Sequence, residues 1–268
     1  MKSLLSPCLA FPALLALTIL PASALVVPYS NDFSGIGSNT SFVNPAGTWN
    51  LSGGAYSTTI GTGTNVISSA AQTFTNLDGV SFTMTTRFSV SSVATLPGNQ
   101  SFTLGFGAFA NNAGFTGNYY LADFAYTGQG TANPAKGTLR ILAIGDTTDF
   151  AGTTGSAIDS AATGNLAITS DSVYTLTLTG TYTGPSLDFS LALYNNLGVQ
   201  IGSTATGTDS TPLSGDFFGY RNRDSGNVSS GSTVINYDNF GIALVPEPHA
   251  GLPILAALSL GLLLRRRR

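Results

Sequence analysis

Cysteine, histidine and glutamate are almost absent from this 268-residue sequence. Cys8, His249 and Glu247 are the only residues of their types, so residues 25–244 contain none of them. A domain without cysteine forms no disulfide and offers no thiol nucleophile, so its core must supply its stability. Without histidine, Ser-His-Asp and Cys-His catalysis lack their general base, and zinc lacks its preferred ligands. These absences exclude most hydrolytic and metal-dependent chemistry.

Positive charge is also scarce between the two ends of the chain. From Leu25 to Leu264 there are five basic and thirteen acidic residues, a net charge of −8, whereas the whole chain carries −3. The five basic residues are Arg87, Lys136, Arg140, Arg221 and Arg223. An acidic surface repels phosphate backbones, so the composition argues against nucleic-acid binding.

No window of residues 25–244 has a 3.6-residue apolar period, and the dominant rhythm is two. Tyr174, Leu176, Leu178, Gly180 and Tyr182 alternate with four threonines. Such alternation places one face of a strand on a core and the other in water. Turn residues at Thr183-Gly-Pro185 and Asn195-Asn-Leu-Gly198 predict hairpins. We therefore predict an all-β antiparallel sandwich, a jelly roll of about ten to thirteen strands, with no substantial helix.

The first 24 residues have the pattern of a secretory signal peptide. Lys2 precedes an apolar stretch from Leu4 to Leu20, and Ala22-Ser-Ala24 follows as a small-residue cleavage site. We expect cleavage after Ala24, a mature chain that begins at Leu25, and export through the Sec translocon. The β-sandwich ectodomain is then expected to span residues 25–244.

Residues 245–268 combine three features in a fixed order. Pro246, Glu247 and Pro248 precede an uncharged apolar segment at 250–264, and the chain ends on a basic tail of Arg265, Arg266, Arg267 and Arg268. The alternative is an apolar helix packed on the domain, but packing on a domain does not require four arginines at the end of the helix. Fifteen helical residues are short for a ~30 Å bilayer core, so flanking residues would complete the transmembrane helix. The arginines are expected to stop the segment on the cytoplasmic side of the membrane.

This order resembles the PEP-CTERM sorting signal of Gram-negative bacteria. The resemblance implies an inner-membrane intermediate that an exosortase recognises and cleaves near the motif. The freed protein would then reach the cell surface or the extracellular matrix. The resemblance covers only the tail and implies nothing about the domain that precedes it.

A second resemblance covers about residues 28–243. It consists of Asn31-Asp-Phe33, Trp49 and Gly53-Gly-Ala-Tyr56 near the start, and Phe218-Gly-Tyr-Arg221 and Val234–Ile242 near the end. This layout is similar to the concanavalin A-like and laminin-G-like jelly rolls. The resemblance implies that the first and last strands pair.

Two pairs of aspartates are candidates for catalysis or metal binding. Glycosidases generally need paired carboxylates, and the nearest candidates are Asp146 and Asp149, which also suit a solvated turn. Asp32 and Asp238, on the expected first and last strands, are candidates for a structural calcium ion, since calcium needs only oxygen ligands. Their alternative role is to cap turns or accept backbone hydrogen bonds. We expect no catalytic residues and no other cofactor.

Sugar binding would require exposed aromatic side chains. The candidates are Trp49, Tyr119, Tyr120, Tyr126 and Tyr220, with core packing as the alternative for each. Adjacent Tyr119 and Tyr120 must point to opposite faces of a strand, so one is expected to point outward. Trp49 suits the core, and Arg221-Asn-Arg-Asp224 suits either a solvated turn or a loop that grips an acidic sugar.

The sequence favours an exported, non-enzymatic envelope or extracellular-matrix protein with a structural or adhesive role in exopolysaccharide or biofilm. One alternative is a lectin-like module that binds extracellular polysaccharide. A second alternative is an all-aspartate glycan hydrolase.

Overall fold

The structure is a computed structural model that describes residues 28–34, 42–60, 67–74, 77–91, 101–127, 136–145, 156–158, 166–224 and 233–245. The expected signal peptide, the sorting motif, the apolar segment, the basic tail and both Asp146 and Asp149 lie outside these ranges. Within them, no helix has the length and apolarity needed to cross a bilayer. Predictions about export and processing therefore stay predictions.

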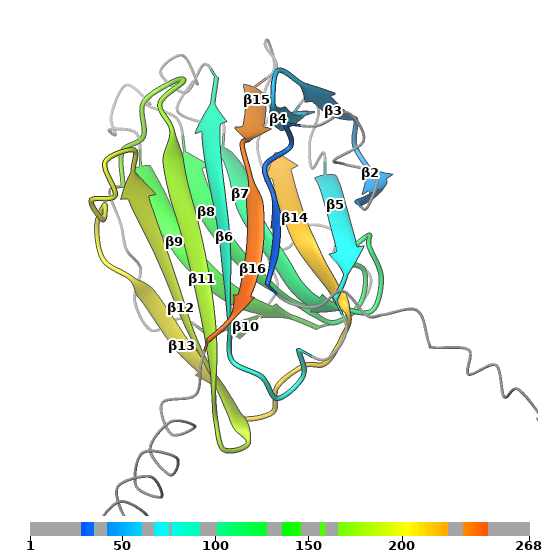
Figure 1. Cartoon of the computed structure of the whole chain (residues 1–268). Coiled ribbons are helices and arrows are strands. Elements are labelled where there is room, and N and C mark those ends of the chain that lie inside the picture. The colour runs from blue at the N-terminus through cyan, green and yellow to red at the C-terminus, as the bar shows by residue number, and fades with distance from the viewer. Residues whose placement is uncertain are drawn as a thin grey trace, which may run out of the picture.

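Two antiparallel sheets stack face to face (Figure 1). The nine-stranded sheet runs in the order β13 (Ala205–Asp209), β12 (Ser186–Asn195), β11 (Tyr174–Thr183), β6 (Phe82–Val90), β15 (Thr233–Tyr237), β4 (Ala55–Ile60) and β3 (Trp49–Ser52). Beside this path, β16 (Phe240–Leu244) pairs with β6, and β1 (Tyr29–Asn31) pairs with β16. The sandwich predicted from the two-residue rhythm is confirmed.

The seven-stranded sheet forms the second layer. Its order is β10 (Ser156–Ala157), β9 (Lys136–Ile144), β8 (Tyr119–Thr127), β7 (Ser101–Ala110), β14 (Phe217–Asp224), β5 (Ile67–Thr73) and β2 (Val43–Ala46). The described residues thus hold sixteen strands, more than the sequence indicated. The surplus arises because strands of two to four residues, such as β1, β2 and β10, are too short to show an alternation.

The expected pairing of the first and last strands is present. Tyr29 pairs with Ile242, and Asn31 pairs with Phe240, so β1 lies beside β16 (Figure 1). The predicted hairpin at Thr183-Gly-Pro185 is also confirmed, because Thr183 pairs with Ser186 across a two-residue turn. Gly184 has a φ of +62° there, a conformation that residues with a side chain rarely adopt.

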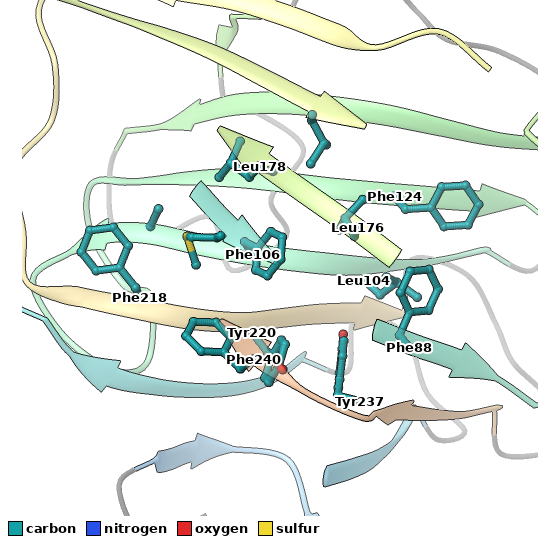
Figure 2. Close-up of a cluster of buried hydrophobic side chains, with 14 of the residues drawn as sticks. Phe88, Leu104, Phe106, Phe124, Leu176, Leu178, Phe218, Tyr220, Tyr237 and Phe240 are labelled. Atoms are coloured by element: carbon teal, nitrogen blue, oxygen red, sulfur yellow. The ribbon is translucent and has the colours of Figure 1, made fainter. Parts of the chain in front are cut away.

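A single core fills the space between the sheets (Figure 2). The alternating side chains of β11, Tyr174, Leu176 and Leu178, point into it, as the rhythm predicts. From the other sheet, β7 contributes Phe102, Leu104 and Phe106. The threonines of β11 occupy the opposite face. Because both sheets share this one core, the sandwich is expected to be a single cooperative unit.

Candidate ligand-binding face of the seven-stranded sheet

The outer face of the seven-stranded sheet, the face turned away from the other sheet, has an apolar half. We call its buried members the outer apolar cluster: Ala71, Ala110, Ala113, Phe115, Tyr119, Leu121, Leu142 and Ile144. Residues 111–118, between β7 and β8, bring Phe115 onto the sheet. A Cβ placed on Gly107 would lie 2.2 Å from Cε1 of Phe115, so only a glycine allows this contact. This half of the face is therefore filled by the protein itself.

Asn112 holds that connection in place. Its Oδ1 accepts hydrogen bonds from the backbone N–H groups of Gly114 and Thr116, at 3.0 and 3.2 Å. Its Nδ2 donates to the carbonyl oxygen of Thr116 at 2.9 Å. One amide side chain thus closes the turn that places Phe115.

The other half of the outer face carries charge. Asp123 on β8 pairs with Arg140 on β9 and with Gly105 on β7. Between the pairs Tyr220–Phe106 and Arg223–Thr103, the register sets Arg221 of β14 level with Gly105. Arg221 in turn pairs with Ser69 of β5. Since directly opposed residues share a face, these positions form one line across five strands, which we call the charged row: Arg140, Asp123, Gly105, Arg221 and Ser69.

Asp123 and Arg140 form a two-pronged ion pair. Nε of Arg140 donates to Oδ1 of Asp123 at 2.9 Å, and Nη2 donates to Oδ2 at 2.6 Å. The Asp123 side chain is fully buried, whereas 31% of the Arg140 side chain is exposed. Paired donors and acceptors of this kind fix the plane of the guanidinium as well as its position. The charged row therefore ends in Arg140, whose guanidinium is oriented by the buried Asp123 and is partly exposed to solvent.

The remaining arginines of this face lie on β14 and not in a loop. The expectation of a polar loop at 221–224 is wrong, because these residues continue β14. Arg221 is 1% exposed and Arg223 is 7% exposed. The guanidinium carbon of Arg221 lies 6.0 Å from the centre of the Tyr119 ring, where the charged row meets the outer apolar cluster.

The four tyrosines predicted as sugar platforms, Tyr126 among them, are all buried. Tyr119 and Tyr120 do point to opposite faces, but Tyr119 is covered within the outer apolar cluster. Tyr120 points into the core, where its hydroxyl donates to Oδ2 of Asp209 at 2.7 Å and accepts from the N–H of Leu213 at 2.8 Å. The expectation that one of the pair is open to a ligand is wrong, because the chain folds back over the outward one.

Tyr220 belongs to an aromatic stack inside the core (Figure 2). Its ring lies 3.9 Å from that of Tyr237, and Trp49 stacks on Tyr56 with ring centres 4.7 Å apart. Burial raises the pKa of Tyr220 well above its usual range, so its hydroxyl stays neutral and donates to the carbonyl of Asn239 at 2.8 Å. The core role predicted for Trp49 is confirmed, and Tyr220 serves the core as well.

The two aspartates predicted as calcium ligands have protein partners. Asp238 forms an ion pair with Arg87 at 2.8 Å, and Asp32 accepts hydrogen bonds from the N–H and hydroxyl of Ser34. Among the described residues, no three acidic, histidine or cysteine side chains gather closely enough to hold a metal ion. A calcium ion at this position stays an untested prediction.

Sequence reasoning missed Asp123 and Arg140. One signal was present: each is a lone charge at an outward position of an otherwise apolar strand, within Tyr120–Tyr126 and Leu139–Ile144. Their pairing depends on the register between β8 and β9, which alternation alone does not determine.

No protein-family model matches this chain, and neither does any curated protein sequence. Solved structures do share its fold. The Emp47p carbohydrate recognition domain superposes with a TM-score of 0.54 at 13% identity, covering 85% of this chain and 100% of that one. The potassium-bound Emp46p carbohydrate recognition domain gives 0.50 at 10% identity, with coverages of 80% and 94%. The CBM2 module of the evolved Dit of Lactobacillus casei BL23 phage J-1 gives 0.50 at 14%, with coverages of 82% and 96%. These likenesses show a lectin-like β-sandwich.

Proposed function

We propose that this chain is a carbohydrate-binding module. The observation that carries the proposal is the complete two-sheet sandwich, which three domains described as carbohydrate recognition domains or a carbohydrate-binding module share over at least 80% of this chain. The fold neighbours favour this function over the structural or adhesive role that the sequence suggested first. The binding face is the outer face of the seven-stranded sheet, at the exposed end of its charged row.

The module is proposed to bind without catalysis. The described residues include no cysteine, histidine or glutamate, so the usual nucleophiles and general bases are missing from them. Asp123, the buried carboxylate of the face, is held by Arg140 in a bidentate pair, which suits a fixed ionised group better than a proton donor.

Export is part of the proposal. The A-x-A signal at Ala22–Ala24 and the PEP-CTERM-like tail from Pro246 to Arg268 support delivery through the inner membrane to the cell surface or matrix. There the module would meet extracellular polysaccharide. Fractionation that found the chain intact and dissolved in the cytosol would contradict this half of the proposal.

Binding of the detergent-solubilised full-length chain to an array of polysaccharides tests the function. We expect saturable binding to at least one polysaccharide and no release of reducing sugar. Binding to none of them would favour the structural or adhesive role. Release of reducing sugar that is lost in Asp146→Asn would instead favour the all-aspartate hydrolase.

A further inference from the structure

We infer that the charged row recognises the carboxylate of an acidic saccharide, and that Arg140 is the residue that contacts it. The inference rests on the proposed function, since it names the class of sugar that the module would bind.

Positive charge on this acidic domain is concentrated on one face. Three of the five basic residues between Leu25 and Leu264, namely Arg140, Arg221 and Arg223, lie on the outer face of the seven-stranded sheet. The same 240-residue span has a net charge of −8. A polyanion is repelled by most of such a surface and attracted to the one face that carries the arginines. Charge placement therefore selects this face for an anionic ligand.

The guanidinium of Arg140 is prepared for a planar anion. Asp123 accepts from Nε and Nη2, and this bidentate pair keeps the guanidinium from reorienting when a ligand arrives. Since Asp123 lies along the Nε–Nη2 edge, a ligand carboxylate would approach the Nη1–Nη2 edge, and a planar guanidinium matches a carboxylate better than the compact ammonium of lysine does. Asp123 is fully buried, so it acts as a positioning residue that reaches the ligand only through Arg140.

Exposure singles out Arg140 within the face. Its side chain is 31% exposed, whereas Arg221 and Arg223 are at most 7% exposed. Thr138, two residues earlier on β9 and on the same face, is also partly exposed. A saccharide would therefore meet Arg140 beside the hydroxyl of Thr138. The two buried arginines of β14 lie farther along the same face and add positive potential there.

The chain supplies a matched control on its opposite surface. Arg87 and Asp238 form an ion pair at 2.8 Å, and their side chains are 50% and 48% exposed. This pair belongs to the nine-stranded sheet and its β15–β16 connection. Neutralising the Arg87–Asp238 pair removes one positive and one negative charge, as neutralising the Arg140–Asp123 pair does, but on the other side of the sandwich.

Binding of polygalacturonate to the full-length chain in detergent tests the inference. The double variant Asp123→Asn/Arg140→Gln removes both charges together, which avoids leaving one buried charge alone. We expect it to weaken binding by about tenfold or more, because charge-assisted hydrogen bonds are lost. The control Arg87→Gln/Asp238→Asn should bind as the unchanged chain does, and Arg140→Lys should fall between them. Circular dichroism verifies that each variant is folded. The affinity of the unchanged chain for polygalacturonate should fall as the salt concentration is raised.

The polymer offers a second control, because its carboxyl groups can be reduced to alcohols without changing the backbone. Equal affinity for the reduced polymer would overturn the acidic class of ligand and leave the proposed function intact. Unchanged binding in a folded Asp123→Asn/Arg140→Gln variant would overturn the site. Failure to bind any acidic or neutral polysaccharide would overturn the proposed function itself, and with it this inference.

Discussion

At the scale of single residues, the surroundings of Asp78 and Asp188 shift the pKa values of the two carboxyl groups in opposite directions. Burial, and then the nearby charge of Asp216, raise the pKa of Asp78. Hydrogen bonds from the hydroxyls of Thr208 and Thr183 lower the pKa of Asp188. The ionised form is therefore disfavoured at the first site and favoured at the second.

We expect Asp78→Asn to raise the melting temperature modestly at pH 7. A carboxyl whose pKa is raised on folding stabilises the fold below its unfolded pKa of about 3.9 and loses that contribution as pH rises through the folded pKa. The gain from the variant should therefore shrink as pH falls toward about 4. Melting curves between these two pH values measure it.

Asp188→Asn is the control with the opposite sign. It should lower the melting temperature at pH 7, because it removes a carboxylate that two threonine hydroxyls stabilise. If both variants shifted the melting temperature in the same direction, the cause assigned to Asp78 would be wrong.

At the scale of elements, the close approach of β7 to β8 depends on a glycine. A Cβ on Gly105 would lie 2.2 Å from the carbonyl oxygen of Ala122 and 2.6 Å from Cα of Asp123. Both are backbone atoms, which cannot turn away as a side chain can. The same glycine lies between Asp123 and Arg221 in the charged row, so strand packing and the binding face share one position.

Gly105→Ala is expected to destabilise the fold by about 1–3 kcal/mol, because the added methyl group overpacks the contact between two strands. Gly145→Ala, immediately after β9, is the matched control, since a Cβ there meets nothing within 4 Å. Urea denaturation midpoints measure both variants. Similar midpoints for the two would show that β8 can shift to accept the methyl group.

The sequence predicts the long strands and their inner faces, but it does not predict which segments cover the outer faces. The alternation at Tyr174, Leu176 and Leu178 predicts β11 and its inner face, because a one-sided strand shows a period of two. On β7, every residue from Phe102 to Ala110 is buried, and Phe115 and its neighbours cover the second face at Gly107 and Ala110. Burial of that kind comes from a contact made by another segment, so a local pattern does not reveal it.

The same limit explains the candidate site. Adjacent Tyr119 and Tyr120 had to face opposite ways, and they do, but the sequence did not show that both sides are closed. Asp123 and Arg140 are 17 residues apart, and they meet only because the β8–β9 register brings them together. The register between two strands is a property of the folded sheet and not of either strand alone.

At the scale of the whole molecule, the fluorescence of Trp49 can show whether the two sheets unfold together. Trp49 is the only tryptophan, it is 9% exposed, and its Nε1 donates to the carbonyl of Ala46 at 3.1 Å. Its ring lies 5.9 Å from that of Tyr220, which belongs to the other sheet. Its surroundings therefore depend on both layers being in place.

We expect Trp49 emission to be blue-shifted in the native state and to shift to the red in one transition on unfolding. That transition should coincide with the loss of β-sheet circular dichroism, because the two sheets share a single core. Polysaccharide binding should leave the emission unchanged, since Trp49 lies in the core and the seven-stranded sheet separates it from the charged row on the outer face. Two separated transitions would mean that the sheets unfold independently.

The pairing of β1 with β16 has a mechanical consequence. Tyr29 lies opposite Ile242, so the polypeptide enters and leaves the sandwich at the same edge. A pulling force applied to the chain before Tyr29 and after Leu244 would separate β1 from β16 one residue pair at a time. It would not load all the hydrogen bonds between the two strands at once. A domain strung between two such attachment points would release its outermost strands at low force, and the aromatic interior would yield only afterwards.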